Sequence, residues 1–251
     1  THGRTSLVGV CPNVMPFHHL GPITHTARDA ALVLQTLAGY DPRDAASRDV
    51  AVPDFTEDWT RGVRGMRLVL CPDFYMNAEV DSEVDRAFAE AVRVFGSLGA
   101  TVESVSFKNG KRLTELFPAI SGPEFAEFHR PFYEKNPDGY GASVRDRLAW
   151  SFRITADEYV RGLRERELLR REVAEFFLSA DALLLPSMPC AAPLIESLMA
   201  KVNGKEYPCM WIHRPFLGPH NLTGCPAVSL PMGFDRERMP LSLQIVGSEW
   251  N

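Results

Sequence analysis

The sequence has 251 residues, of which 45% are hydrophobic and 24% charged, a mixture that excludes an intrinsically disordered chain. Its 27 basic and 32 acidic residues give a net charge of −5, so no electrostatic footprint for nucleic acid is present. No apolar run approaches the roughly 20 residues that a membrane-spanning helix needs, and this length predicts one domain over residues 1–251.

The cysteines are odd in number and widely spaced, and none forms a C-x-x-C pair: they are Cys11, Cys71, Cys190, Cys209 and Cys225. This pattern favours neither a disulfide framework nor a structural zinc site. We therefore expect a reducing, cytoplasmic location.

The first predicted element is a helix that begins after Thr26. Asp29 stands three residues later, which makes a capping box with Asp in the place of Glu. Apolar residues continue at helical spacing until Gly39, which is a typical helix stop.

A strand–helix–strand unit follows. Residues 66–70 form a short apolar run that predicts a buried strand, and Asp81 opens a helix with one apolar face that ends at Gly99. Residues 101–107 predict a second strand. Such a crossover predicts two parallel strands in one sheet.

Residues 111–178 are predicted to be mostly helical, with breaks at Pro118, Pro131 and Pro137. Thr155 is predicted to cap the longest helix, which runs to about residue 178. The arginines of residues 161–171 alternate with glutamates, a pattern typical of a solvated helix face rather than a binding patch.

Three more strands are predicted, at residues 182–185, 226–231 and 241–246, the last two separated by the charged turn 235–238. The order of the elements predicts an α/β fold in which a mixed, twisted β-sheet is covered by helices on both faces.

Two blocks of sequence resemble the amidase-signature family. The first comprises residues 21–30 and 39–44. The second comprises residues 181–187, 221–227 and 240–247, which are similar to the family segments D-x-L-L-x-P-T, N-x-T-G-x-P-A and P-x-G-x-Q-x-x-G in the same order. The resemblance covers almost the whole chain and is weakest over residues 108–160. It implies the amidase-signature fold, incomplete in this chain.

The resemblance also implies an amide hydrolase that acts without metal or cofactor through a Ser-cisSer-Lys triad. One serine attacks the amide carbonyl while a neutral lysine acts as base through the second serine, and backbone N–H groups form the oxyanion hole. The Gly/Ser-rich loop that carries both serines is absent from this sequence. No lysine stands in the family's lysine context, so none receives a catalytic role: they are Lys108, Lys111, Lys135, Lys201 and Lys205.

The matching blocks contain departures from the family pattern. His18 stands where the family usually has Asp, His25 where it usually has Arg, and Ser242 replaces a frequent Gly. The resemblance therefore does not predict the backbone geometry of residues 18–26.

Substrate-binding residues are predicted at a strand's carboxyl end, where open α/β sheets bind ligands, and in the helical region that varies most within the family. Ordinary packing is an equally good interpretation for each, and Asn and Thr before Gly224 are also typical of an element's end. The predicted residues are Ile120, Ser121, Glu124, Met188, Pro189, Trp211, His213, Asn221 and Thr223.

Other sites are less favoured. His18 and His19 are adjacent and point in opposite directions in an extended segment, and His213 and His220 complete no zinc pattern. A nucleophilic Cys190 or Cys225 is an alternative, but inert buried thiols are much commoner.

Three functions remain open for the parent protein, whose substrate would be a small-molecule amide. The first is an amidase. The second is the glutaminase (A) subunit of a tRNA-dependent amidotransferase, which ranks lower because residues 208–212 do not resemble the usual stretch of that protein. The third is a catalytically dead module with a binding or structural role. A homodimer is compatible with each, and neither the substrate nor the oligomeric state follows from the sequence.

The chain begins without methionine and stops just after an apolar run. We therefore expect an internal piece of a longer polypeptide that lacks the upstream catalytic part and the extreme C-terminus. Such a piece exposes apolar surface that the whole protein buries, which predicts low solubility or aggregation.

Overall fold

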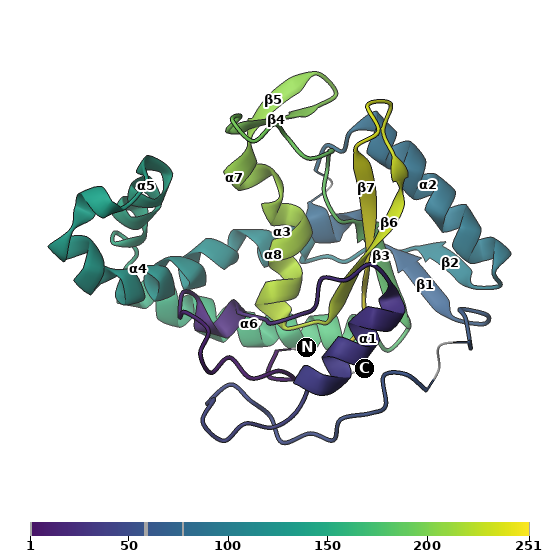
Figure 1. Ribbon diagram of the computed structural model, residues 1–251, viewed down its shortest axis with the longest axis horizontal. Coiled ribbons are helices and arrows are strands. Elements are labelled where there is room, and N and C mark those ends of the chain that lie inside the picture. Colours follow the sequence, from purple (N-terminus) through teal and green to yellow (C-terminus); the bar gives the residue numbers. More distant parts are fainter. Residues whose placement is uncertain (1, 58–59, 77, 251) are drawn as a thin grey trace. The chain divides into compact units, whose positions relative to one another are not determined.

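The computed structural model describes residues 2–57, 60–76 and 78–250 (Figure 1). Its helices and strands, with η for short 3₁₀ helices, are in chain order η1 Met15–Phe17, α1 Ala27–Leu37, β1 Arg67–Leu70, η2 Pro72–Tyr75, α2 Ser82–Ser97, β2 Thr101–Ser104, α3 Gly110–Glu115, α4 Phe117–Lys135, η3 Pro137–Gly139, α5 Ala142–Ser151, α6 Ala156–Phe176, β3 Ala182–Pro186, β4 Met199–Val202, β5 Lys205–Pro208, α7 Cys209–Ile212, α8 Arg214–Thr223, β6 Ala227–Phe234 and β7 Pro240–Val246.

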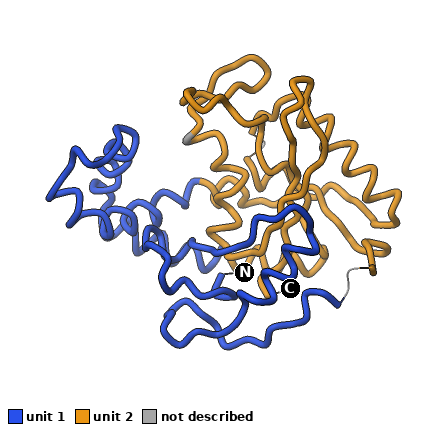
Figure 2. The backbone as a smooth tube through the Cα atoms, viewed as in Figure 1, with its two compact units in different colours: residues 1–59, 115–169 blue, residues 60–114, 170–251 orange. Residues whose placement is uncertain are grey.

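The backbone divides into two compact units (Figure 2). Unit 1 comprises residues 1–59 and 115–169, and unit 2 comprises residues 60–114 and 170–251. Unit 1 is built from helices and long loops, whereas unit 2 contains the sheets. The helix α6 passes from unit 1 into unit 2.

Unit 2 is organised around a five-stranded sheet in the order β2-β1-β3-β7-β6. Strand β1 pairs in parallel with β2 and β3, whereas β7 is antiparallel to both β3 and β6. The predicted strand–helix–strand unit is therefore confirmed as β1-α2-β2, and the predicted mixed sheet of an α/β fold is confirmed. The second strand is shorter than predicted, since pairing stops at Ser104.

Strand β3 is buried along its whole length, which explains its unbroken run of apolar residues. Leu184 belongs to a cluster with Leu68, against which Phe88 of α2 packs. Leu183 and Leu185 point to the opposite face and are 0% exposed, so both faces are covered. On that second face the side chain of Gln244, the partner of Leu185, donates to the carbonyl of Phe216 on α8 (2.8 Å).

The hairpin β4–β5 and the helix α8 are absent from the elements predicted above. Residues 199–208 contain no sustained alternation of apolar and polar side chains, but Asn203-Gly204, which has positive φ at both residues, is a typical hairpin-turn pair that the prediction missed. Helix α8 contains Pro215 at its start and Pro219 in its interior, and prolines at this spacing are typical of a loop rather than of a helix.

Unit 1 confirms the predicted capping of two helices. The hydroxyl of Thr26 accepts a bond from the backbone N–H of Asp29 (3.1 Å) at the start of α1. At the start of α6, Thr155 and Glu158 form a reciprocal capping box, since the N–H of Thr155 donates to the Glu158 carboxylate (2.7 Å) and the N–H of Glu158 donates to the Thr155 hydroxyl (3.3 Å).

The predicted break at Pro131 is wrong. Helix α4 continues through Pro123 and Pro131 and ends only at Lys135. A proline removes one backbone donor, and here the buried face of α4, which includes Ile120 and Phe125, packs against α5 and keeps the helix continuous.

The prediction of a fully solvated arginine face on α6 is also wrong in part. Arg166 is only 9% exposed, donates to the carbonyl of Pro16 (3.0 Å) and lies 5.2 Å from the centre of the Phe17 ring. Alternating charge along the sequence does not reveal which arginine points inward, because that depends on the neighbouring loop. Among the described residues, no helix combines the length and apolar character that crossing a membrane requires.

Candidate functional site

The predicted residues of unit 1 lie on the middle of α4. Ile120 and Ser121 are buried, and Glu124 is half-buried. The hydroxyl of Tyr159 on α6 donates to the Glu124 carboxylate. Burial and this carboxylate raise the pKa of Tyr159 to about 12, so the phenol remains protonated and acts as a donor.

Close helix packing fixes this part of α4. A Cβ at Gly122 would overlap the side chain of Ile154, just before α6, and a Cβ at Gly162 of α6 would lie 3.1 Å from Ile120. Both glycines therefore let the helices approach closely. The positions of Ser121 and Glu124 are consequently set by backbone packing rather than by a mobile loop.

The predicted residues Met188 and Pro189 follow directly after β3 in unit 2. Met188 is half-buried and Pro189 is buried. The carbonyl of Pro189 accepts a bond from the N–H of Asp81, the N-cap of α2 (2.8 Å). This loop is therefore held at the carboxyl end of the sheet, the edge where α/β sheets bind ligands.

Trp211 and His213 lie at α7. The indole of Trp211 is 46% exposed, and the guanidinium of Arg214 lies over it at 4.1 Å. The Nδ1–H of His213 donates to the carbonyl of Cys209 (2.8 Å). A small core of Cys190, Ala200 and Val202, against which Cys209 and Ile212 pack, connects α7 to the hairpin and to the loop after β3.

A polar clasp, formed by Glu79, Asp81, Asn203, Lys205 and Tyr207, fastens the hairpin to the start of α2. Asn203, at the left-handed φ of 48°, accepts a bond from the N–H of Ser82 (2.9 Å) through its side chain, and its own N–H donates to Asp81 (3.0 Å). Glu79 accepts bonds from Tyr207 (2.8 Å), Lys205 (3.0 Å) and Asn203 (3.2 Å). These donors lower the pKa of Glu79 to about 2, so the clasp is charged at neutral pH.

We expect Asn203→Ala to release the hairpin and thereby loosen α7. The substitution removes the side-chain hydrogen bonds to Ser82, Val80 and Glu79. It also places alanine at a positive φ, which alanine tolerates less well than asparagine. Amide exchange of residues 199–213, measured by mass spectrometry, should accelerate about tenfold. Asn203→Gly separates the two causes, since it keeps the favourable φ but lacks the side-chain bonds. Unchanged exchange in both variants would show that the clasp does not hold the hairpin.

Asn221 and Thr223 lie at the far end of α8. Thr223 is buried, and its hydroxyl donates to the carbonyl of Pro219 (2.9 Å), while the guanidinium of Arg170 donates to the carbonyl of Thr223 (3.3 Å). Asn221 is half-buried. Thr223 therefore acts as the end of a helix that Gly224 terminates at φ 80°, the structural interpretation offered by the sequence.

Within unit 2 the predicted residues form two groups. The small core places Cys190, the residue after Pro189, near Cys209 and Ile212 of α7, the helix that also contains Trp211. The ten residues of α8 separate His213 from Thr223 by about 15 Å along the helix axis. The binding role of each residue stays a prediction.

A row of polar side chains across β3, β7 and β6 was not among the predicted site residues. The hydroxyls of Ser187 and Ser229 lie 2.9 Å apart, and the amide of Gln244 donates to Phe216 (2.8 Å) from a position only 2% exposed. Ser187 and Gln244 both belong to the blocks that carry the family resemblance. Those blocks were the signal that could have identified the row.

Neither Cys190 nor Cys225 offers an activated nucleophile. All five are free thiols. Burial raises the pKa of Cys190 and raises that of Cys225 to about 11, so both remain thiols at neutral pH. In the part of the chain that the structure describes, no group of three or more His, Cys, Asp or Glu side chains could hold a metal ion.

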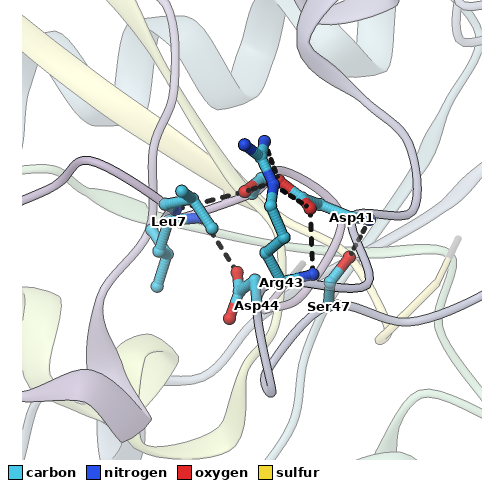
Figure 3. A network of polar contacts seen from close by, with 7 residues as sticks. Leu7, Asp41, Arg43, Asp44 and Ser47 are labelled. Atoms are coloured by element: carbon cyan, nitrogen blue, oxygen red, sulfur yellow. Dashed lines mark hydrogen bonds and ion pairs between the residues drawn. The ribbon is translucent and has the colours of Figure 1, made fainter.

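The block at residues 39–44 has a structural role in unit 1 (Figure 3). The guanidinium of Arg43 makes two bonds of 2.9 Å to Asp41, and the Ser6 hydroxyl donates to the same carboxylate (2.8 Å). These bonds hold the pKa of Asp41 well below its usual range. Asp44 accepts a bond from the N–H of Leu7 (2.8 Å), so the block fastens the first residues of the chain to the loop after α1.

Comparison with known proteins identifies relatives over the full length of the chain. A family model described as Amidase matches residues 1–251. An amidase of Pseudomonas putida is 34% identical over 238 residues, which cover 94% of this chain and 51% of that protein. The A subunit of the glutamyl-tRNA(Gln) amidotransferase of Myxococcus xanthus is 32% identical over 271 residues, which cover 98% of this chain and 54% of that protein.

A solved crystal structure of an amidase has a similar fold, with a TM-score of 0.82 and 27% identity. The match covers 99% of this chain and 53% of the solved one. The chain thus spans about half the length of the curated relatives it matches.

Proposed function

The chain belongs to the Amidase family, and from this premise we propose that it is part of an enzyme that hydrolyses a carboxylic amide to an acid and ammonia or an amine. The observation that carries the proposal is the match of the family model to all 251 residues. Because the match includes both units, it also supports their assignment to one domain of the parent enzyme.

In this proposal the catalytic Ser-cisSer-Lys triad lies upstream of Thr1, and this chain supplies the sheet and part of the substrate pocket. The nine predicted pocket residues belong to this proposal. The support for a shared pocket differs among these residues. Helix α7 and the loop that follows β3 meet at one small core at the sheet edge, whereas Asn221 and Thr223 lie at the other end of α8. A cytoplasmic location and a homodimer are further parts of the proposal.

A second function, the glutaminase component of a tRNA-dependent amidotransferase, is favoured by one specific observation. The relative in Myxococcus xanthus is the A subunit of a glutamyl-tRNA(Gln) amidotransferase and is nearly as similar as the Pseudomonas putida amidase, at 32% against 34% identity. Copurification of a second, tRNA-binding protein with the parent protein would favour this alternative.

The coding sequence upstream of Thr1 provides the first test. We expect it to encode a lysine followed by a Gly/Ser-rich loop with two serines, and the whole protein to release ammonia or amine from simple aliphatic or aryl amides. Replacement of the nucleophilic serine by alanine should abolish release, because that serine forms the acyl intermediate. Absence of the serines or the lysine would exclude this catalytic route and favour the binding-module alternative.

A further inference from the structure

The chain contains two asparagine–glycine pairs, Asn109-Gly110 and Asn203-Gly204, both in unit 2. In such a pair the backbone nitrogen of the glycine can attack the side-chain carboxamide of the asparagine, because glycine has no Cβ to hinder the approach. Asparagine is accordingly among the thermolabile residues of proteins. The two pairs lie in different surroundings, and these surroundings decide which of them can react.

The pair Asn109-Gly110 is locked at the start of α3. Gly110 is buried, and its N–H donates to the carbonyl of Phe107 (3.2 Å). The carbonyl of Asn109 accepts the N–H of Leu113 (3.3 Å), and its side-chain amide donates to the Glu172 carboxylate (2.6 Å). Attack by the Gly110 nitrogen therefore requires the start of this helix to unfold.

The pair Asn203-Gly204 forms an exposed hairpin turn. The pairing of β4 with β5 ends at Val202 opposite Lys205, so the two residues make up the whole turn. Both are exposed, and their φ angles are 48° and 78°. A short surface turn of this kind opens without global unfolding, so water and the Gly204 nitrogen can reach the carboxamide.

The polar clasp and the start of α2 hold the carboxamide of Asn203 at both ends. Its Oδ1 accepts the N–H of Ser82 (2.9 Å), and its Nδ2 donates to the carbonyl of Val80 (3.0 Å) and to the carboxylate of Glu79 (3.2 Å). These bonds must break before the carboxamide can turn toward the nitrogen of Gly204. They slow the attack without preventing it, because each hydrogen bond contributes only modestly.

We propose that Asn203 is a site of spontaneous deamidation and that the polar clasp sets the rate of this reaction. The nitrogen of Gly204 forms a bond to Cγ of Asn203, and its proton passes to a base in the solvent. The bond from Cγ to Nδ2 breaks, and the amine takes a proton from water and leaves as ammonia. Water then opens the cyclic imide at either carbonyl, which produces aspartate or isoaspartate. This chemistry is independent of the proposed amide hydrolysis.

Deamidation would release the hairpin permanently. The new carboxylate oxygen replaces a donor with an acceptor, opposite the carbonyl of Val80 and the carboxylate of Glu79. Glu79 is charged at neutral pH, since its donors lower its pKa to about 2, so the two carboxylates repel. Isoaspartate also adds a carbon to the backbone of the turn, which disturbs the pairing of Val202 with Lys205. Modification at this position therefore loosens the hairpin and α7, which packs against it.

Peptide mapping by mass spectrometry tests which pair reacts. The purified protein is incubated at mildly alkaline pH, which favours deprotonation of the attacking nitrogen, both in buffer and in concentrated urea. The ratio of the two rates in urea is the reference for the unfolded chain. In buffer we expect this ratio to shift toward Asn203 by at least about tenfold. An unshifted ratio, or no conversion of Asn203 in buffer when both pairs react in urea, would overturn the proposal.

Substitutions at Ser82 test the role of the clasp. Ser82 is the first residue of α2, where proline is favoured, and Asp81 before it has the extended backbone that suits a residue preceding proline. Ser82→Pro removes the N–H that holds Oδ1 of Asn203 and should speed deamidation about fivefold. The matched control Ser82→Ala keeps this N–H and should change the rate less than about twofold. Equal rates in the two variants would contradict control of the reaction by the clasp.

Two further measurements cover the case in which Ser82→Pro fails to fold. Glu79→Ala, at an exposed position, removes one bond to Nδ2 and should also speed deamidation severalfold. Amide exchange of residues 199–213 should be about tenfold faster in the deamidated protein and in Asn203→Asp than in fresh protein, while residues 67–70 of β1 keep their exchange rate. An unaltered rate of deamidation in Glu79→Ala, or unaltered exchange of residues 199–213 after complete deamidation, would refute the proposal.

Discussion

Replacement of Gly110 by alanine is expected to destabilise the protein by about 3 kcal/mol, because a Cβ at this position has no room. Gly110 is buried at the start of α3, and its added methyl group would overlap the backbone carbonyl of Asp73 in η2. A backbone carbonyl cannot rotate away as a side chain can. The Asp73 carboxylate also accepts the N–H of Phe107 (2.8 Å), so movement of η2 would break a second contact.

Thermal unfolding provides the measurement, with an expected fall in Tm of roughly 6–12 °C for a chain of this size. Gly96→Ala is the matched control, since Gly96 lies inside α2 and nothing would lie within 4 Å of its Cβ. Alanine has the higher helix propensity, so the control should gain about 0.5–1 kcal/mol. Equal stability of the Gly110→Ala variant and the unsubstituted chain would show that η2 and α3 are not in this close contact.

Stability is expected to fall by about 3 kcal/mol as the pH falls from 6.5 to 4, because of His220. This histidine on α8 is 5% exposed, lies parallel to the ring of Phe74 with 6.2 Å between ring centres, and has no hydrogen-bond partner for either ring nitrogen in the described part of the chain. Burial lowers the pKa of His220 from 6.5 to about 4. In this window the unfolded chain binds a proton that the folded chain does not, so acid favours unfolding.

His220→Phe should remove this contribution and keep the stacking on Phe74. Urea unfolding of the variant and the unsubstituted chain between pH 4 and 7.5 measures the difference, which should grow as the pH falls. His25→Gln, which replaces an exposed histidine, is the matched control. The depressed pKa of Glu79, about 2 against an ordinary 4.5, also removes stability as the pH falls below about 4.5, but this loss is common to the variant and the unsubstituted chain and cancels in their difference. A difference between His220→Phe and the unsubstituted chain that is constant with pH would refute this assignment.

Much of the fold was predictable because its signals are local. The capping residues Thr26 and Thr155 form bonds within three positions along the chain, and the apolar run of β3 is the direct consequence of burial on both sheet faces. The turn at 235–238 is charged and joins two apolar strands, so the hairpin β6–β7 follows from the same kind of pattern. Family membership was predictable for a related reason, since the motifs that carry the resemblance are short runs of neighbouring residues in a fixed order.

The candidate site was less predictable, since its members act through distant contacts. The clasp joins Glu79 and Asp81 to Asn203, more than 100 positions later, and the residues next to them in the sequence do not indicate these hydrogen bonds. The predictions at Pro131 and Arg166 were wrong for the same reason. Packing against α5 keeps α4 helical through Pro131, and the hydrogen bond to the carbonyl of Pro16 turns Arg166 inward.

The sequence by itself determined the class of the elements, their order, the mixed sheet and the family, because helical and strand periodicity, caps and ordered motifs are properties of neighbouring residues. Only the tertiary structure decided which polar groups are buried, paired or left without a partner. It separated Thr223 from His213 by the length of α8, and it enclosed His220 without a hydrogen-bond partner for its ring nitrogens among the described residues. Burial and pairing depend on which distant segments meet, and these contacts set the charge and reactivity of each group.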